Sequence, residues 1–145
     1  MTWTLTRTRR LLCPPDQAWE LVSDLALTPT LNPMIRSVET SGPDEGLGAR
    51  RRCRAAGPGH IDEEVVSWVP GQHVTLRIVG GMPIRAEGTW TVSEADIGTE
   101  VRFDYVPLPH LGPVGSTMHR LMRRQLARNF DAMLDALVDH VEVLR

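Results

Sequence analysis

Two segments near the middle of the chain alternate apolar and polar residues, as a β-strand with one covered face does. In residues 83–94 the apolar side is formed by Ile84, Ala86, Gly88, Trp90 and Val92, with Arg85, Glu87, Thr89 and Thr91 between them. In residues 99–107 the same side is formed by Val101, Phe103 and Tyr105. Successive side chains of a strand point to opposite faces, so these segments predict an antiparallel sheet that is wet on one side and covered on the other.

Further short segments extend this sheet. Glycine and proline turns separate the segments 36–42, 47–56, 60–69 and 73–80, which is the spacing of consecutive hairpins. Residues 2–12, rich in threonine and apolar residues, suit a first strand. The sequence therefore predicts an antiparallel sheet of about seven strands.

Helical spacing of apolar residues appears in two places. Pro14 and Pro15 end the first strand and favour a helix start, so a short helix is predicted over 15–25. Pro29 and Pro33 break the next segment into a turn or a second short helix. Residues 116–143 predict one long helix of about 40 Å, with one apolar face to cover the sheet: Met118, Leu121, Met122, Leu126, Phe130, Met133, Leu134, Leu137 and Val141.

Composition narrows the function. The 145 residues suit one domain, 1–145. All sixteen basic residues are arginine, which excludes Schiff-base chemistry on a lysine. Two cysteines without a CxxC pair argue against a disulfide scaffold and structural zinc.

With no signal peptide and no apolar run of ~20 residues, a cytoplasmic location without a membrane span is expected. The net charge of -2 disfavours nucleic-acid binding.

Several short motifs carry a family resemblance. They are CPPDQAWELVSDL at 13–25, Asn32-Pro33, VVSWVP at 65–70 and GTEV at 98–101. Together with the order of elements, they resemble the START-like (SRPBCC, Bet v 1-like) helix-grip superfamily, which includes the polyketide cyclase/dehydrase type. The resemblance implies an α+β helix-grip fold, a curved sheet wrapped around a long C-terminal helix, with two short helices after the first strand. Within this superfamily, the chain resembles the bacterial type. Thr28 and Leu31 stand where the family often has tryptophans. These smaller side chains would either widen the cavity mouth or be packed over by neighbouring residues.

The resemblance also implies a cavity between sheet and long helix. There the chain would bind a small hydrophobic molecule, a polyketide, isoprenoid or lipid. The alternative is a polyketide cyclase, aromatase or dehydratase acting on a ligand in that cavity, and the sequence leaves open which. The other interpretation is that these residues form an ordinary filled core with no ligand pocket. The residues expected to line the site are Trp68, Trp90, Phe103, Tyr105, Met118, Met122, Phe130 and Arg51.

Tyr105 and His119 are the candidate catalytic residues, because a buried phenol needs a hydrogen-bond partner and an imidazole titrates near neutral pH. His119 is predicted in the first turn of the long helix, at the cavity mouth. His110, in the preceding loop, is read as solvated. Alternation along 47–56 separates Arg51 from Arg50, Arg52 and Arg54. Arg51 would then be either an inward anion anchor or part of a solvated row.

The remaining charged groups suggest no metal or cofactor. His60, Asp62 and Glu64 share one face of a strand, which a solvated surface explains better than a metal site. Arg120, Arg124 and Arg128 form a row on the long helix, flanked by Arg123. The row would attract an acidic partner such as an acyl carrier protein, or is only solvated. A monomer or a homodimer is equally compatible with the sequence.

Overall fold

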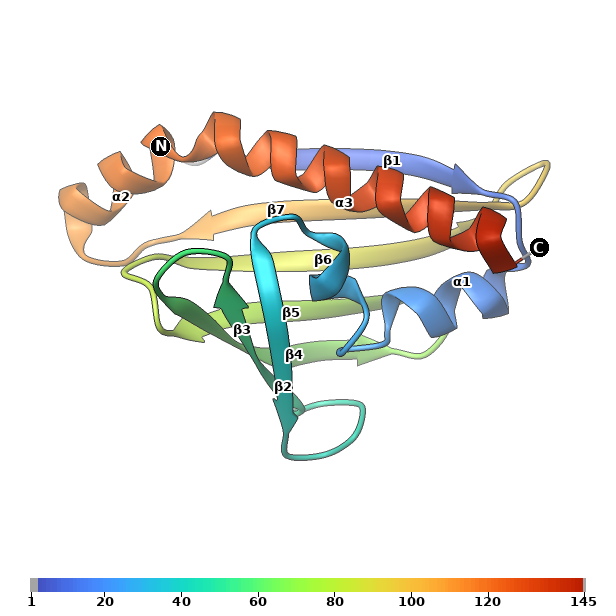
Figure 1. Ribbon diagram of the computed structural model, residues 1–145, viewed down its shortest axis with the longest axis horizontal. Coiled ribbons are helices and arrows are strands. Elements are labelled where there is room, and N and C mark those ends of the chain that lie inside the picture. Colours follow the sequence, from blue (N-terminus) through green and yellow to red (C-terminus); the bar gives the residue numbers. More distant parts are fainter. Residues whose placement is uncertain (1–2, 145) are drawn as a thin grey trace.

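The predicted sheet has seven antiparallel strands in the order β1-β7-β6-β5-β4-β3-β2. It is seen in a computed structural model that describes residues 3–144 (Figure 1). Thr2, which opened the predicted first strand, lies outside the described residues. The strands are β1 (Leu5–Leu11), β2 (Ile35–Ser41), β3 (Arg50–Ala55), β4 (His60–Val69), β5 (His73–Gly80), β6 (Arg85–Glu94) and β7 (Thr99–Leu108). Only β1 and β7 pair across a long stretch of sequence, as β1 closes the edge beside β7.

Four helical segments accompany the sheet. Helix α1 (Pro15–Val22) and the 3-10 helix η1 (Thr28–Leu31) are the two short helices expected after the first strand. Helices α2 (Gly112–Leu121) and α3 (Arg123–Leu144) follow β7. Figure 1 shows α3 running along the sheet beside β1 and β7, with α2 set at an angle to it. The α+β helix-grip architecture is thereby confirmed.

The prediction of one helix over 116–143 was wrong in one respect. Helix α2 begins at Gly112 and ends at Leu121, and α3 starts in a new direction at Arg123, after Met122. Met122 has near-helical backbone angles, φ -81° and ψ -9°. The helical spacing of apolar residues therefore continues across the break, and the sequence pattern does not reveal it. Leu121, assigned to the apolar face, is 80% exposed as a result.

The core lies between the sheet and α3. Trp90 and Val101 on the sheet and Leu134 and Leu137 on α3 are almost fully buried. The alternation predicted in 83–94 and 99–107 corresponds to this arrangement, because the apolar positions Ile84, Ala86, Trp90 and Val92 and then Val101, Phe103 and Tyr105 are all buried.

Ion pairs between β1 and α3 hold the helix along the edge of the sheet. Arg7 Nε lies 2.8 Å from Asp131 Oδ1, and Arg9 Nε lies 2.9 Å from Asp135 Oδ1. These pairs give Asp131 and Asp135 of α3 their counter-charges on β1. Because the groups are partly exposed, each pair contributes at most about 1 kcal/mol.

Candidate functional site

A cavity of about 460 Å³ lies between the concave face of the sheet and α3. Small-molecule sites commonly enclose roughly 300–1,000 Å³. Its walls are supplied by strands β2 to β7, η1, the β3–β4 turn, Met122 and the first half of α3. Its apolar lining includes Ile35, Ile61, Leu76, Ile78, Met82, Ile84, Ala86, Trp90, Phe103, Met122, Leu126, Phe130 and Met133.

Four aromatic side chains form a continuous wall of this cavity. Trp90 and Phe103 have ring centroids 4.8 Å apart, and Phe130 of α3 lies 4.9 Å from Phe103 and 5.0 Å from Tyr105. Gly88 of β6 makes room for them, since a Cβ there would lie 2.9 Å from Phe103 Cζ. Four of the residues expected to line the site are therefore together.

Of the other candidates, Met122 and Arg51 also line the cavity, whereas Met118 and Trp68 do not. Trp68 packs edge-on against Trp19 of α1, with ring centroids 5.2 Å apart. Met118 is partly buried against the core on α2. The sequence reading missed Leu76 and Ile78, although the buried alternation of β5 carried the signal. It also missed Gln125 and Asn129, polar residues of α3 that bond to each other at 3.0 Å beside the cavity.

Arg51 points inward and forms a buried ion pair with Glu63. Arg51 Nε donates to Glu63 Oε1 at 2.9 Å, and the two side chains are 7% and 14% exposed. Arg51 Nη1 donates to the Leu25 carbonyl at 3.2 Å and to Thr28 Oγ1 at 2.9 Å. Thr28 therefore uses its hydroxyl to hold Arg51, which a tryptophan at this position would not do.

The neighbouring arginines of β3 face outward, so the solvated-row reading holds for them and not for Arg51. Arg50, Arg52 and Arg54 pair with Glu64, Asp62 and Glu39 on the outer face. The pKa of Asp62 lies below its ordinary value, because Arg52 donates a hydrogen bond to the ionised carboxyl group. His60 Nε2 lies 3.6 Å from Asp62 Oδ2 on the same strand. Within residues 3–144, no three metal-ligating side chains are grouped.

Cys53 lines the cavity beside Glu63, and its thiol lies 3.6 Å from Glu63 Oε1. Burial, with the nearby Glu63 charge, raises the pKa of Cys53 to about 12. Thiolate is the reactive form of cysteine, and burial disfavours that form of Cys53 at neutral pH. Cys13 is also buried and unbridged.

Tyr105 and His119 form a hydrogen-bonded pair at the cavity wall. The phenol oxygen lies 2.5 Å from His119 Nε2. His119 was predicted in the first turn of a long helix, but it lies in the last turn of α2 and is 4% exposed. The break at Met122 lets α2 turn this ring toward β7. Tyr105 lines the cavity and His119 does not, so the histidine lies behind the tyrosine.

Burial keeps both groups of this pair neutral near pH 7. It raises the pKa of Tyr105 above its ordinary value, with the Glu63 charge as a second cause. It lowers the pKa of His119 below 6.5. Each shift disfavours the charged form, because a charge loses hydration on burial. A proton can therefore be shared along the pair, while a free phenolate or imidazolium is disfavoured.

The His119 shift predicts a pH dependence of stability. The pKa is depressed in the folded protein, so protonation favours the unfolded chain. The free energy of unfolding should fall as the pH drops below about 6.5, the unfolded value. Urea unfolding at pH 7.5 and 5.5 measures this, and His119→Gln should show a smaller fall. An equal fall in the variant would contradict the assignment.

The arginines predicted as one row on one helix lie on the surface of two helices, Arg120 on α2 and Arg124 and Arg128 on α3. Arg120, Arg124 and Arg128 are exposed, and within the described chain no carboxylate pairs with them. Arg123 lies over the ring of Trp3, 5.6 Å from its centroid. No helix in residues 3–144 is long and apolar enough to cross a membrane.

Solved structures share this architecture at low sequence identity. A protein of Thermus thermophilus is 21% identical, covers 98% of this chain and 99% of its own, and has a TM-score of 0.78. The Zhui aromatase/cyclase of a Streptomyces species is 18% identical, covers 98% and 94%, and has a TM-score of 0.79. A START superfamily protein of Mycobacterium smegmatis is 16% identical, covers 98% and 99%, and has a TM-score of 0.74.

At these identities the likeness concerns the fold. No curated protein matches the chain. A family match is nevertheless clear, because residues 2–142, nearly the whole sequence, fit the family described as polyketide cyclase / dehydrase and lipid transport. The helix-grip fold, the cavity under α3 and this match agree, and the chain belongs to the polyketide cyclase / dehydrase and lipid transport family.

Proposed function

We propose that the protein binds a small, mainly apolar molecule, a polyketide, an isoprenoid or a lipid, in the cavity between the sheet and α3. The observation that carries this proposal is the cavity itself, about 460 Å³ behind an aromatic wall in a fold of only 145 residues. Close-packed interiors leave few voids larger than a water molecule. A space of this size lined by methionine and aromatic side chains suits an adaptable apolar ligand.

The polar end of the cavity gives this ligand an orientation. Arg51 commits Nε and Nη1 to Glu63, Thr28 and the Leu25 carbonyl, and within residues 3–144 no partner accepts from its Nη2. Glu63 likewise uses Oε1 for Arg51 and leaves Oε2 without a donor among these residues. A ligand with a carbonyl oxygen and a neighbouring hydroxyl would match this donor and acceptor, as an oxygenated polyketide does.

Titration with the uncharged fluorescent probe N-phenyl-1-naphthylamine tests the binding proposal. We expect saturable uptake of one probe per chain, with blue-shifted emission, because the aromatic wall excludes water from the probe. An uncharged probe avoids attraction to surface arginines. If fluorescence stays at the level of free probe up to its solubility limit, the cavity does not bind apolar molecules and the proposal fails.

The second candidate function is a cyclase, aromatase or dehydratase reaction on the bound ligand. The Tyr105–His119 pair favours it, because a phenol at the cavity wall with a histidine behind it can pass a proton to or from the ligand. The cavity would fold the substrate into a reactive conformation. An acidic carrier of such a substrate, for instance an acyl carrier protein, would suit the exposed arginines of α2 and α3.

Tyr105→Phe separates the two functions. In an enzyme, this variant should lower turnover of a poly-β-ketone substrate by roughly 10²-fold or more while probe affinity changes little. Turnover would be followed by chromatography of the cyclised products. No turnover by either protein, with intact probe binding, would leave binding as the function and remove the catalytic role of Tyr105.

A further inference from the structure

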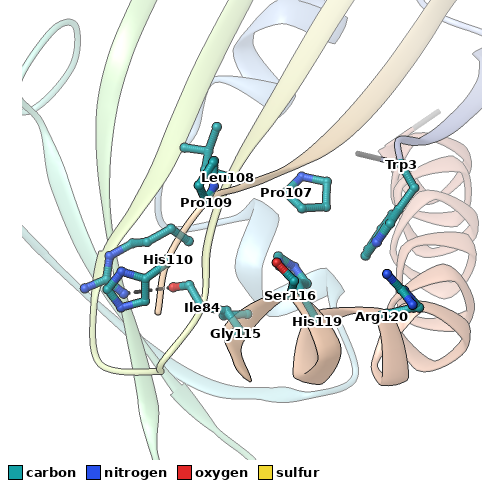
Figure 2. Close-up of a pocket in the computed structure, with 11 residues that line it drawn as sticks. Trp3, Ile84, Pro107, Leu108, Pro109, His110, Gly115, Ser116, His119 and Arg120 are labelled. Carbon is teal, nitrogen blue, oxygen red and sulfur yellow. Dashed lines mark hydrogen bonds between the residues drawn. The ribbon is translucent and has the colours of Figure 1, made fainter. Parts of the chain in front are cut away.

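A second pocket of about 210 Å³ lies on the other side of the Tyr105–His119 pair. Figure 2 shows it between the end of β7, at Pro107 to Pro109, and α2, with Trp3 and Arg120 at one end and His110 at the other. Ile84 alone lines both this pocket and the apolar cavity. Ligand binding in the larger cavity therefore does not account for the second pocket.

The lining of this pocket carries positive charge without a carboxylate. Its eleven residues are Trp3, Ile84, Arg85, Pro107, Leu108, Pro109, His110, Gly115, Ser116, His119 and Arg120. Arg85 and Arg120 are permanently charged, and His119 can gain a proton. The arginines on the outer face of β3 all lie beside a carboxylate, so their charge is largely balanced and that of this pocket is not.

Two hydrogen-bond donors of the pocket, Arg85 and His119, are held in place. Arg85 Nη1 donates to the carbonyls of Met82 at 2.9 Å and Ile84 at 2.8 Å, which fixes the guanidinium. Its Nε and Nη2 have no acceptor within residues 3–144. Tyr105 fixes His119 through Nε2, and the other ring nitrogen, Nδ1, has no partner in the same residues. The exposed Ser116 adds a hydroxyl group.

The backbone around the pocket is closely packed. A Cβ on Gly115 would lie 1.8 Å from the His110 carbonyl oxygen, so α2 sits directly against the loop that leads into it. Trp3 closes one side, with its ring edge-on to His119 at a centroid distance of 5.3 Å. A ligand would therefore meet a preformed site, and little ordering of the chain would oppose binding.

We propose that this pocket binds a small oxyanion, a carboxylate or a phosphate group, held by Arg85, Arg120, Ser116 and the Nδ1 of His119. Arginine is suited to carboxylate and phosphate, since its fork of N–H groups can bond two oxygens at once. The anion is either a free ion or the head group of an amphipathic molecule.

Anion binding should be coupled to protonation of His119. A bound anion favours the imidazolium form that burial otherwise opposes. The groups that surround the ring are Tyr105 of β7, Arg85 of β6, His110 of the loop and Arg120 of α2, with Arg123 beyond Trp3. Within this set no carboxylate competes for the proton. Affinity should therefore rise as the pH falls from 7.5 to 5.5.

Calorimetric titration at constant ionic strength tests the site, with inorganic phosphate, acetate and hexyl phosphate as ligands. NMR of the histidine rings in parallel reports the His119 pKa, which bound phosphate should raise. Saturable binding of all three at one site is expected. Equal affinity for phosphate and hexyl phosphate would identify a free ion, and a preference for hexyl phosphate would identify a head group.

Two matched pairs of variants make the test specific. Ser116→Asp places a carboxylate in the pocket and should abolish phosphate binding, while the isosteric Ser116→Asn should retain it. Arg85→Gln should weaken binding about tenfold or more, since a hydrogen bond to a charged group is lost. Arg128→Gln, an exposed arginine outside the pocket, should leave affinity unchanged. Circular dichroism and thermal melting check that each variant folds.

The proposal is overturned by any of three results. These are no saturable phosphate binding, equal weakening in Arg85→Gln and Arg128→Gln, and phosphate binding that survives in Ser116→Asp. Uptake of the uncharged probe by the larger cavity is measured separately. Failure of the anion site therefore leaves the proposed function unaffected.

Discussion

Arg51→Leu should lower the free energy of unfolding by about 3–5 kcal/mol. The substitution removes a buried guanidinium whose bonds reach Glu63, Thr28 and the Leu25 carbonyl. It leaves the Glu63 carboxylate, 14% exposed, without its counter-charge. Urea unfolding at pH 7.5 measures the effect. Arg52→Leu is the matched control, because its pair with Asp62 lies on the wet face and should contribute no more than about 1 kcal/mol.

The double variant Arg51→Leu/Glu63→Leu makes this prediction sharper. Removing both charges leaves no buried ion, so the double variant should be more stable than either single variant. Destabilisation equal to the sum of the two single effects would show that the groups do not interact. A loss in Arg51→Leu no larger than in Arg52→Leu would contradict the buried pair.

Ala86→Phe should weaken binding of N-phenyl-1-naphthylamine by more than about tenfold. Ala86 lies on β6, almost fully buried, and lines the cavity. A phenyl ring there would occupy space that the probe needs. Because the space is empty, stability should change by less than about 1 kcal/mol, whereas insertion into a close-packed core costs about 1–3 kcal/mol.

Val79→Phe is the control for this variant. Val79 is exposed on β5, adjacent in sequence to the cavity residue Ile78 but on the opposite face. A phenyl ring there should leave probe affinity unchanged. If Ala86→Phe is strongly destabilised and binds the probe as well as the parent does, the cavity is not the binding site.

The sequence predicted the wall of the cavity better than its polar groups. Trp90, Phe103 and Tyr105 were assigned to one face, because strict alternation leaves no freedom once the face is chosen. Arg51 could be separated from its neighbours in the same way. Which face is the inner one depended on tertiary packing, which brings Arg51 to Glu63 of β4 and Thr28 of η1.

Contacts between segments far apart in the chain could not be predicted from local sequence patterns. His119 reaches Tyr105 only because the helix breaks at Met122, and near-helical backbone angles hide that break from periodicity. Asp131 and Asp135 of α3 contact Arg7 and Arg9 of β1, which lie more than 120 residues away in the sequence. Trp68 packs against Trp19 of α1, because tertiary packing decides which face of β4 this side chain occupies.

Native mass spectrometry of the freshly purified protein tests the central claim most directly. If the cavity binds an apolar molecule, the folded chain should carry a small-molecule adduct or take up one equivalent of N-phenyl-1-naphthylamine. The adduct should disappear on unfolding, pass into an organic extract and be reduced in Ala86→Phe. A folded chain that shows only its own mass and takes up no probe at saturation would contradict the account.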